Sequence, residues 1–592
     1  MLGTGELSTV AFVLAAAVIL APWCYVVGVL LERQLVWRSW LRDVPGPPRE
    51  TFFMGNFPEF GRRDVVRVCL NWMQQYGGAV RFWAAIGEPR LLLSDVVALD
   101  HVLCKRVYAY PKVRLAARTL GGLMGNGIIV AEGEVHHRQK AAIQPGFSTR
   151  SIRNLSPIFA FHAQHLRDVF GKMTRGGAVE TNVHALLSAA ALDALGEAAF
   201  GLDFGALAAA RRGDNGNVHS THPLPAAFER ALAMATNTTK LSNIFDAFTM
   251  IFPILEKLPF GVNSPAFRRE MSVLHRAASE VVEQTKADVV REESEEIGEK
   301  AAPGADVEEG CHPRHREQRN RSHSRPDLLA SLLRANRNAQ RGAGEKHSVL
   351  DRATLTDDEL VGQVSTFIFA GHETTATQLT WLLWMLAEHQ EVQKQLRSEI
   401  RAARANLGLN AVPQACDADD PANRELELEE YSAIEYLDWC VRESLRLHGA
   451  IHTTSRIAQE PDVIPCSDGR RIMVQKGTLV LIPLSSISQD PALWGNDAHV
   501  FRPERWAEPL PGAKVFPRFG GLSFLQGPRA CVGRTFAQAE MKSFLCVLLN
   551  AFEFHSAGRR IIPKRWLVSR PFEPGTRRDG CTLQVRALNE GM

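Results

Sequence analysis

The chain has 592 residues, and its 68 basic and 65 acidic residues leave a formal net charge of +3. This near balance excludes a strong overall field of the kind that draws a protein to nucleic acid. The length allows a sizeable core, in several average domains or in one large enzyme domain. The ten cysteines are scattered, without a CxxC pair or zinc-like spacing, which favours a reducing, cytosol-facing fold.

Residues 9–31 form an almost uninterrupted apolar run, TVAFVLAAAVILAPWCYVVGVLL. As a helix this run would span roughly 34 Å, which is enough to cross the hydrocarbon core of a bilayer. A cleaved signal peptide is the alternative, but no Lys or Arg precedes the run, whereas Arg33, Arg38 and Arg42 follow it. We therefore expect a permanent transmembrane anchor, with residues 1–8 as a short non-cytosolic N-terminus.

Residues 32–48 are expected to form a linker, because they end in the stiff proline-rich segment PGPP. Residues 80–93 then predict two strands around a Gly-Glu-Pro turn. Residues 108–134 are rich in glycine and poor in helical periodicity, which predicts a long loop. Apolar residues at helical spacing, for example in residues 159–169 and 186–200, predict helices.

The composition changes at about residue 290. An acidic run is followed by a segment rich in His and Arg, and apolar residues almost disappear until residue 325. This pattern predicts a disordered charged insertion at about residues 290–325, within one domain. The basic half could contact anionic lipid or nucleic acid, but a solvated loop is favoured because the adjacent opposite charges partly cancel.

Residues 356–388 give the strongest helix prediction. Thr356-Asp-Asp-Glu359 has the capping-box pattern, and apolar residues follow at helical spacing. In the middle lies AGHETT, residues 370–375, where Glu373 and Thr374 place polar groups near an apolar face. An amphipathic helix explains a single polar residue here, but it does not explain the cluster.

Glu443 and Arg446 form an ExxR pair, which places both charges on one helix face. Alone this signal is weak, because surface pairs at such spacing are common and stabilise by less than about 1 kcal/mol. Further along, residues 472–483 predict short strands about a Lys-Gly turn in the same sheet as residues 80–93.

The most specific motif is FLQGPRACVG, residues 524–533, which fills every fixed position of FxxGxRxCxG. This is the cysteine-ligand loop of the haem-thiolate monooxygenases, so the chain resembles a cytochrome P450. A buried structural cysteine is the alternative, but AGHETT, ExxR and PERW (residues 503–506) occur in the family's order. The resemblance is to microsomal-type, fungal members, and it implies a mainly helical catalytic domain with a small β-sheet region over residues 49–592.

The resemblance implies haem b, iron protoporphyrin IX, with Cys531 as the axial ligand of the iron. A thiolate ligand pushes electron density toward bound O2 and favours O–O cleavage, for which the cytochromes P450 are the standard case. The other residues that the resemblance places at the haem are Phe524, Gly527, Arg529, Gly533, Arg456, His136 and Lys140. At the last two positions the family usually has Trp and Arg, and lysine lacks the bidentate fork of arginine.

On the oxygen side, the resemblance implies that Glu373 relays protons and that Thr374 holds the reduced oxygen group and a water molecule. Arg505 would close a buried structural triad with Glu443 and Arg446. The side chains expected at the substrate pocket are Phe367, Phe369, Ala370, Ile451 and His452.

The implied activity is insertion of one oxygen atom from O2 into a lipophilic substrate. Electrons would come from NADPH through a membrane-bound NADPH–cytochrome P450 reductase, with cytochrome b5 as a second donor, and the chain would reside in the endoplasmic reticulum membrane. The layout is similar to that of fungal or animal fatty-acid hydroxylases, so a long-chain fatty acid is the first substrate hypothesis, and a terpenoid or other secondary metabolite is the second. A haem-thiolate isomerase or peroxygenase is a rival that the Glu373 and Thr374 pair disfavours, and a membrane scaffold without haem is another.

Overall fold

The structure is a computed structural model that describes Gly28 and residues 41–210, 222–236, 264–301, 327–341, 354–411, 420–508, 522–565, 567–576 and 578–588. Apart from Gly28, the predicted anchor at residues 9–31 lies outside the described residues, and so do residues 302–326 of the predicted insertion. The chain divides into two compact units. Unit 1 comprises Met1–Val113, Thr453–Ala498 and Gln526–Arg529, and unit 2 comprises Arg114–His452, His499–Leu525 and Ala530–Met592.

Unit 1 is built on a four-stranded sheet in the order β1 (Ala79–Trp83), β2 (Pro89–Leu93), β7 (Leu479–Ile482), β4 (Thr454–Ile457). The hairpin β1–β2 is antiparallel and pairs Ala79 with Leu93, which confirms the two strands predicted in residues 80–93. Strand β7 runs parallel to β2 and antiparallel to β4. The helices of this unit are α2 (Phe57–Arg62), α3 (Val65–Tyr76), α4 (Val96–Asp100), α19 (Leu484–Ile487) and α20 (Pro491–Trp494).

The strands predicted in residues 472–483 are present, and the expected sheet membership is confirmed for β7 but wrong for β6 (Arg471–Val474). Strand β6 pairs with β5 (Asp462–Pro465) in a separate two-stranded sheet, whereas β7 joins the sheet of β1 and β2. The turn between β6 and β7 contains Gly477 at a φ of +90°, a conformation that favours glycine and redirects the chain.

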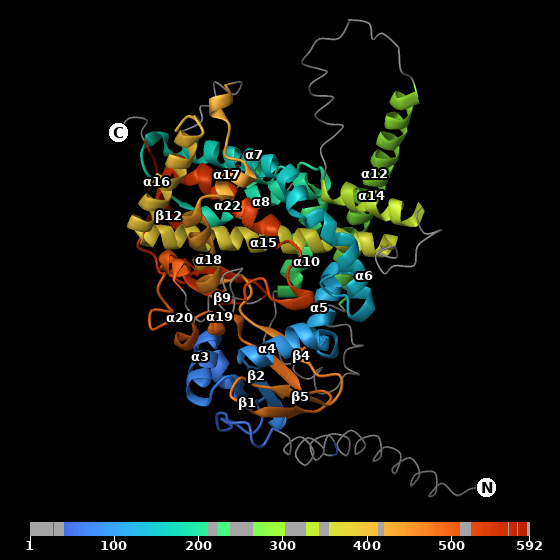
Figure 1. The fold of residues 1–592 in the computed structure, drawn as a ribbon, viewed down its shortest axis with the longest axis vertical. Coiled ribbons are helices and arrows are strands. Elements are labelled where there is room, and N and C mark those ends of the chain that lie inside the picture. The colour runs from blue at the N-terminus through green and yellow to red at the C-terminus, as the bar shows by residue number, and fades with distance from the viewer. Residues whose placement is uncertain are drawn as a thin grey trace, which may run out of the picture. The chain divides into compact units, whose positions relative to one another are not determined.

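Unit 2 is mainly helical (Figure 1). Its helices are α5 (Arg114–Met124), α6 (Gly133–Ile143), α7 (Thr149–Met173), α8 (Val183–Phe200), α9 (Ala206–Ala210), α10 (Pro223–Thr236), α12 (Pro265–Ala301), α14 (Leu328–Arg341), α15 (Asp357–Glu388), α16 (Gln390–Asn406), α17 (Leu428–Ser432), α18 (Glu435–His448) and α22 (Arg534–Ala551). Unit 2 also contains two three-stranded sheets. One has the order β3 (Val179–Asn182), β12 (Thr582–Ala587), β8 (Phe552–Ser556), and the other has the order β11 (Arg578–Asp579), β10 (Ser569–Glu573), β9 (Ile562–Arg565). This architecture fits the mainly helical fold with small sheets that the sequence predicts.

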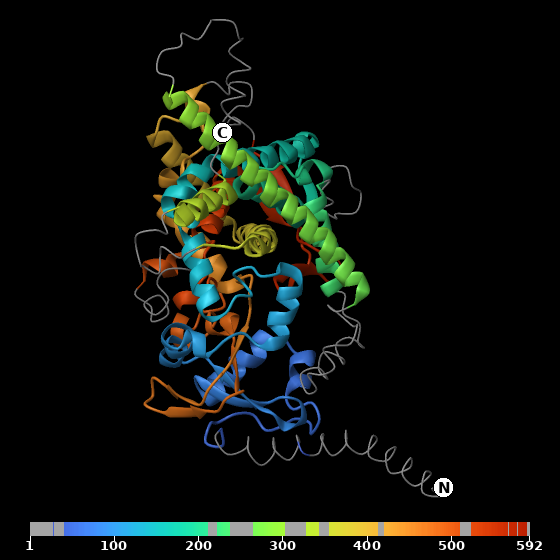
Figure 2. The ribbon, with the colours of Figure 1, turned by 90° about the vertical axis from the view of Figure 1, so that its right-hand side faces the viewer.

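Helix α15 lies at the centre of unit 2, and Figure 2 looks down its axis with other helices of the same unit around it. It contacts α5, α8, α10, α12, α16, α18 and α22. The predicted capping box is present, because the Thr356 hydroxyl accepts from the Glu359 N–H and the Glu359 carboxylate accepts from the Thr356 N–H. Both the helix and its start are therefore confirmed.

Two expectations about local structure are wrong. Residues 114–124 form helix α5 where a loop was expected, since Leu, Ala, Arg and Met favour helix strongly enough to outweigh two glycines, and α5 packs against α15. The insertion does not begin at residue 290, because α12 continues to Ala301. Two acids of the expected insertion are ion-paired: Glu292 contacts Arg334 and Glu293 contacts Arg337 of α14.

Among the described residues, Val183–Phe200 is the one helix that is long and apolar enough to cross a membrane. This helix, α8, contacts α7, α9, α14 and α15, and most of its residues are buried inside unit 2. Its apolar character is therefore that of a core helix.

The capping box yields a stability prediction. Replacing Thr356→Ala removes the acceptor for the Glu359 N–H at the start of α15 and should lower the free energy of unfolding by about 1 kcal/mol, measured by urea titration. The control is Ser294→Ala, which removes an exposed hydroxyl from the interior of α12 and should not destabilise the protein. Equal stability of the Thr356→Ala and wild-type proteins would contradict the role of the cap.

Candidate functional site

Helix α15 is buried along nearly its whole length, except at one place. Between Glu359 and Leu383, only Ala370, Gly371 and Thr374 are not buried. Their spacing of one and four residues places them on the same side of the helix. These three residues belong to AGHETT, so the predicted motif coincides with the accessible side of an otherwise buried helix.

The hydroxyl groups of the motif bond back to the helix. The Thr374 hydroxyl donates to the Ala370 carbonyl at 2.6 Å, and the Thr375 hydroxyl donates to the Gly371 carbonyl at 2.9 Å. Such bonds to the carbonyl four residues earlier loosen a helix slightly. Thr374 thus lies half-buried on the accessible side, with a hydroxyl that can exchange this bond for one to another acceptor.

Gly371 serves the packing of α15 on α8. A Cβ atom at this position would lie 2.5 Å from Leu195 Cδ1 and 2.8 Å from Leu195 Cδ2. Those distances are too short for any side chain, so glycine allows the close approach of the two helices. Gly371 therefore serves the contact of α15 with Leu195 of α8.

Glu373 is 5% exposed and ion-paired. Its Oε1 lies 2.5 Å from Nε of Arg570 on β10 and accepts a long hydrogen bond of 3.5 Å from the Thr377 hydroxyl. Burial raises the pKa of Glu373, but the charge of Arg570 and the imidazoles of His184 and His372 outweigh burial and hold that pKa below its usual value. The acid of the motif is therefore held as a carboxylate.

Cys531 differs from the other cysteines that the structure describes. It is exposed, whereas Cys104 is half-buried and Cys69, Cys440, Cys466, Cys546 and Cys581 are buried. Burial holds the pKa of a structural cysteine high and makes it inert. Of these thiols, Cys531 is the one open to a ligand.

The loop around Cys531 is held in a strained shape. The Cys531 N–H donates to the Phe524 carbonyl at 2.8 Å, and Phe524 itself packs on the core of unit 2. Leu525 has a φ of +56° and is the one non-glycine residue with a positive φ among those described. Such a conformation costs on the order of 1 to 3 kcal/mol and persists only where the surrounding structure fixes it.

Several groups act on the Cys531 thiol. Although the side chain is accessible, desolvation by the surrounding chain raises the pKa of the thiol, while the Gly533 N–H, Arg534 and Lys140 oppose that rise. Helix α22 begins at Arg534, so the partial positive charge of its N-terminus adds to these groups. The loop can therefore hold a thiolate once a metal cation takes the place of the proton.

Lys140, whose charge acts on the thiol, belongs to helix α6. The first turn of α15 fixes α6, because Arg138 donates to both oxygens of Glu359 at 2.9 and 2.5 Å and Gln139 donates to Glu359 at 3.1 Å. Burial raises the pKa of Glu359, but these donors outweigh it and lower that pKa to about 2. His136, also on α6, is buried.

The remaining haem contacts that the resemblance implies lie in unit 1. Arg456 and Arg529 are buried; Arg456 donates to the Thr454 hydroxyl at 2.7 Å, and the Arg529 guanidinium lies 5.5 Å from the centre of the Tyr108 ring. Gly527 has a φ of +74°, and a Cβ there would lie 2.3 Å from the Leu103 carbonyl oxygen. This position therefore requires glycine for the packing of unit 1 itself.

The structure brings Glu443, Arg446 and Arg505 together. Arg446 donates to Glu443 Oε2 at 2.9 Å and to Oε1 at 2.8 Å, and Arg505 Nε donates to Oε1 at 2.9 Å; all three side chains are fully buried. The Trp506 indole N–H donates to Glu443 Oε2 at 3.2 Å. Trp506, the last residue of PERW, thus gives the buried carboxylate a further donor.

The residues expected at the substrate pocket have different neighbours and different burial. Phe367 packs edge-on against Phe147 with ring centres 5.6 Å apart, whereas Phe369 lies 5.9 Å from Phe228 of α10. Ile451 and His452 are half-buried and follow α18. Ala370 alone among these five residues is on the accessible side of α15.

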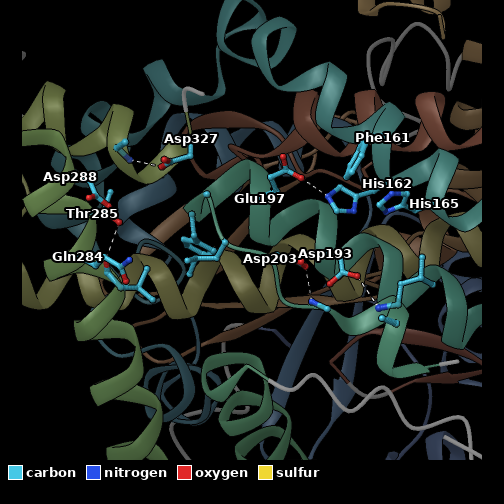
Figure 3. A pocket seen from close by; sticks show the side chains of 18 of the residues that line it. Phe161, His162, His165, Asp193, Glu197, Asp203, Gln284, Thr285, Asp288 and Asp327 are labelled. Carbon is cyan, nitrogen blue, oxygen red and sulfur yellow. Dashed lines mark hydrogen bonds and ion pairs between the residues drawn. The ribbon is translucent and has the colours of Figure 1, made fainter. Parts of the chain in front are cut away.

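A cavity of about 840 Å³ lies elsewhere in unit 2, between α7, α8, α9, α12 and α14 (Figure 3). None of the site residues predicted from the sequence lines this cavity. Its polar groups serve the fold: Glu197 pairs with His162 at 2.8 Å, and Asp193 accepts from the Ala206 and Leu207 N–H groups at 2.7 and 2.9 Å. We assign it no part in the chemistry.

Sequence reasoning missed Arg570. It lies 197 residues from Glu373 in the chain, and no local motif surrounds it. Only the pairing of β10 with its neighbours and the packing of this sheet on α15 bring the guanidinium to the acid.

These residues fit a haem-thiolate cofactor. One accessible thiol with an N–H donor to sulfur, at a helix N-terminus and beside two cations, is the donor set that such a ligand needs. Helix α22, which follows the thiol, contacts α15 within unit 2.

Comparison with known proteins gives consistent results. A family model described as Cytochrome P450 matches residues 45–571. Cytochrome P450 monooxygenase 128 of Postia placenta is 32% identical over 583 residues, which are 94% of each chain. Ganoderic acid synthetase of Ganoderma lucidum is 28% identical over 96% of this chain and 98% of its own, and cytochrome P450 monooxygenase claO of Ampulloclitocybe clavipes is 30% identical over 91% and 92%.

The buried charge cluster generates a prediction. Glu443→Ala would leave two buried guanidinium groups without their shared carboxylate, which should cost roughly 3 to 5 kcal/mol and yield protein without haem absorbance. Glu435→Ala, at an exposed position of the same helix, is the matched control and should load haem normally. A soluble, haem-loaded Glu443→Ala protein would disprove the structural role of the cluster.

Proposed function

Because the chain belongs to the cytochrome P450 family, we propose that it is a fungal haem-thiolate monooxygenase that inserts one oxygen atom from O2 into a lipophilic substrate. The second oxygen atom leaves as water, which requires two protons and two electrons. The electrons would come from NADPH through NADPH–cytochrome P450 reductase, with cytochrome b5 as a second donor. A bound haem b, with Cys531 as the axial ligand, would supply the activation of O2.

One observation carries this proposal. Between Glu359 and Leu383, α15 is buried except at Ala370, Gly371 and Thr374, and the buried acid Glu373 lies beside this opening in the same helix. A monooxygenase needs a proton donor and a hydroxyl at the place where oxygen is reduced. An isomerase or peroxygenase of the same fold class has no such need, so this arrangement favours the monooxygenase.

The residues have distinct proposed roles. Glu373 moves protons to the reaction site, and the Thr374 hydroxyl holds a proton or a water molecule there. Lys140, His136, Arg456 and Arg529 are the residues proposed to hold the propionates of the cofactor, with Gly527, Gly533 and Phe524 shaping its loop. Glu443, Arg446 and Arg505 support the fold and touch neither substrate nor oxygen.

We place an apolar secondary metabolite, such as a terpenoid, first among the substrates. The specific support is one relative, Ganoderic acid synthetase of Ganoderma lucidum, whose name states its product. The earlier hypothesis of a long-chain fatty acid has no such support and becomes the second candidate. Phe367 and Phe369 on α15 are consistent with an apolar substrate in either case.

The location in the cell is part of the proposal. The apolar run at residues 9–31 would anchor the chain in the endoplasmic reticulum membrane, with the PGPP segment as the end of the linker and the catalytic domain in the cytosol. This placement suits a lipophilic substrate and a membrane-bound reductase.

A binding screen tests the substrate class. Terpenoids and long-chain fatty acids are added separately to the purified, haem-loaded protein, and the change in its absorption spectrum is recorded. We expect a saturable change with a terpenoid, followed by oxidised product in the presence of reductase and NADPH. A response to fatty acids alone would reverse the order of the two candidates.

Thr374 provides a direct mutational prediction. Thr374→Ala should retain haem and substrate binding but lower the product formed per NADPH roughly tenfold or more, because proton delivery loses its hydroxyl. The measurement compares NADPH consumption, product and hydrogen peroxide. Ser365→Ala, which removes a hydroxyl from a buried position of α15, is the control. Normal coupling in Thr374→Ala would show that the assignment is wrong.

A further inference from the structure

The acid of the proposed proton relay is tied to the sheet formed by β9, β10 and β11. Arg570 on β10 places its Nε 2.5 Å from Oε1 of Glu373. Side-chain exposure is 33% for Arg570 and 7% for Glu373, so the pair lies near the end of a path from the surface into unit 2. The inference below rests on the proposed function.

Arg570 also lies close to a second acid, Asp579. Its Nη1 lies 3.8 Å from Asp579 Oδ2 on β11, and Asp579 Oδ1 accepts from Lys564 Nζ of β9 at 2.7 Å. Side-chain exposure falls from 55% at Lys564 to 33% at Asp579 and Arg570 and to 7% at Glu373. Charges of alternating sign thus connect the solvent to the buried acid.

The charged groups around Glu373 differ in how closely they contact its carboxylate. The titratable and charged groups that act on it or lie in the same network are Arg570, Asp579, His184 of α8, His372 of its own helix and Glu229 of α10. Arg570 is the cation in direct contact with the carboxylate. Burial lowers the pKa of Arg570, but the charge of Glu373 outweighs it and raises that pKa, so the guanidinium stays protonated.

Glu229 has a different character. Burial, followed by the negative charge of Glu373, raises the pKa of Glu229 to about 7. Near neutral pH this carboxyl group both gains and loses a proton, whereas Glu373 rests as an anion. Arg570 lowers the pKa of both acids, but of the two it forms an ion pair with Glu373.

We propose that Arg570 is a positioning residue for proton delivery. It holds the Glu373 carboxylate toward the β9–β11 sheet, where the acid takes up a proton from solvent, and Asp579 keeps Arg570 in place. The protonated Glu373 no longer needs its counter-ion, turns to the accessible side of α15 and gives the proton to the oxygen side of the reaction; the carboxylate then returns to Arg570. Arg570 transfers no proton, and water is the proton source.

A purely structural ion pair would behave differently. Removing it would lower stability and haem content, and the remaining haem-loaded enzyme would show the coupling and the pH profile of the wild type. A positioning residue alters both in haem-loaded enzyme, because the pKa of Glu373 depends on its counter-ion.

The test uses the full-length enzyme with reductase and NADPH, and it measures product per NADPH between pH 6 and 9 alongside haem content. Because Glu373 rests as an anion in the wild type, wild-type coupling should vary little over this pH range. In Arg570→Gln we expect coupling to fall roughly tenfold and to become pH-dependent, decreasing as the pH rises, since loss of the cation raises the pKa of the acid toward this range. Arg570→Lys should restore part of the coupling. Asp579→Asn should change coupling and its pH dependence in the same direction by less.

Arg559→Gln is the matched control. Arg559 contacts Glu180 and Glu573 near the same sheet, and neither residue contacts Glu373, so coupling and pH profile should stay unchanged.

Wild-type coupling and pH profile in Arg570→Gln, with Thr374→Ala still uncoupled, would overturn the role of Arg570 and leave the proposed function standing. Normal coupling in both Thr374→Ala and Glu373→Gln would overturn the proposed function itself. If Arg570→Gln does not bind haem, the same measurement is made on Arg570→Lys and Asp579→Asn. A wild-type pH profile of coupling in both of these variants would overturn the role of Arg570.

Discussion

The fold of unit 2 depends on burying a long helix that must keep polar groups in its middle. Other helices of unit 2 pack around α15, and its buried acid, Glu373, forms an ion pair with Arg570. An unpaired carboxylate at this depth would be strongly destabilising. Gly371 lets α8 approach closely, and the capping box fixes where the helix begins. The opening at Ala370, Gly371 and Thr374 is therefore a local exception within a well-supported element.

The same physical rule governs the other buried charges. Glu443 lies inside unit 2 and accepts from Arg446, Arg505 and Trp506, so desolvation of its carboxylate is offset by several hydrogen bonds. Cys531 shows the opposite case, because its surroundings disfavour the free thiolate and a metal cation is needed to complete the balance. The buried carboxylates are thus neutralised by groups of the protein itself, whereas the Cys531 thiolate requires a bound metal cation.

Much of this arrangement could be predicted from local patterns. The period of apolar residues and the capping box predict α15, and the residue types of the loop at 524–533 single out Cys531 among ten cysteines. The rest depends on tertiary packing. The contact of Arg570 with Glu373 follows from strand pairing, α5 gains support from its packing on α15, and Glu292 and Glu293 of α12 find their counter-ions on α14. None of these partners is near in sequence.

The central claim is that Cys531 binds haem iron as a thiolate, and the absorption spectrum of the reduced, carbon-monoxide-bound protein tests it most directly. We predict the red-shifted band typical of thiolate ligation for the wild type, and a haem spectrum without that band for Cys531→His. Absence of the band from haem-loaded wild-type protein, or its persistence in Cys531→His, would contradict the account.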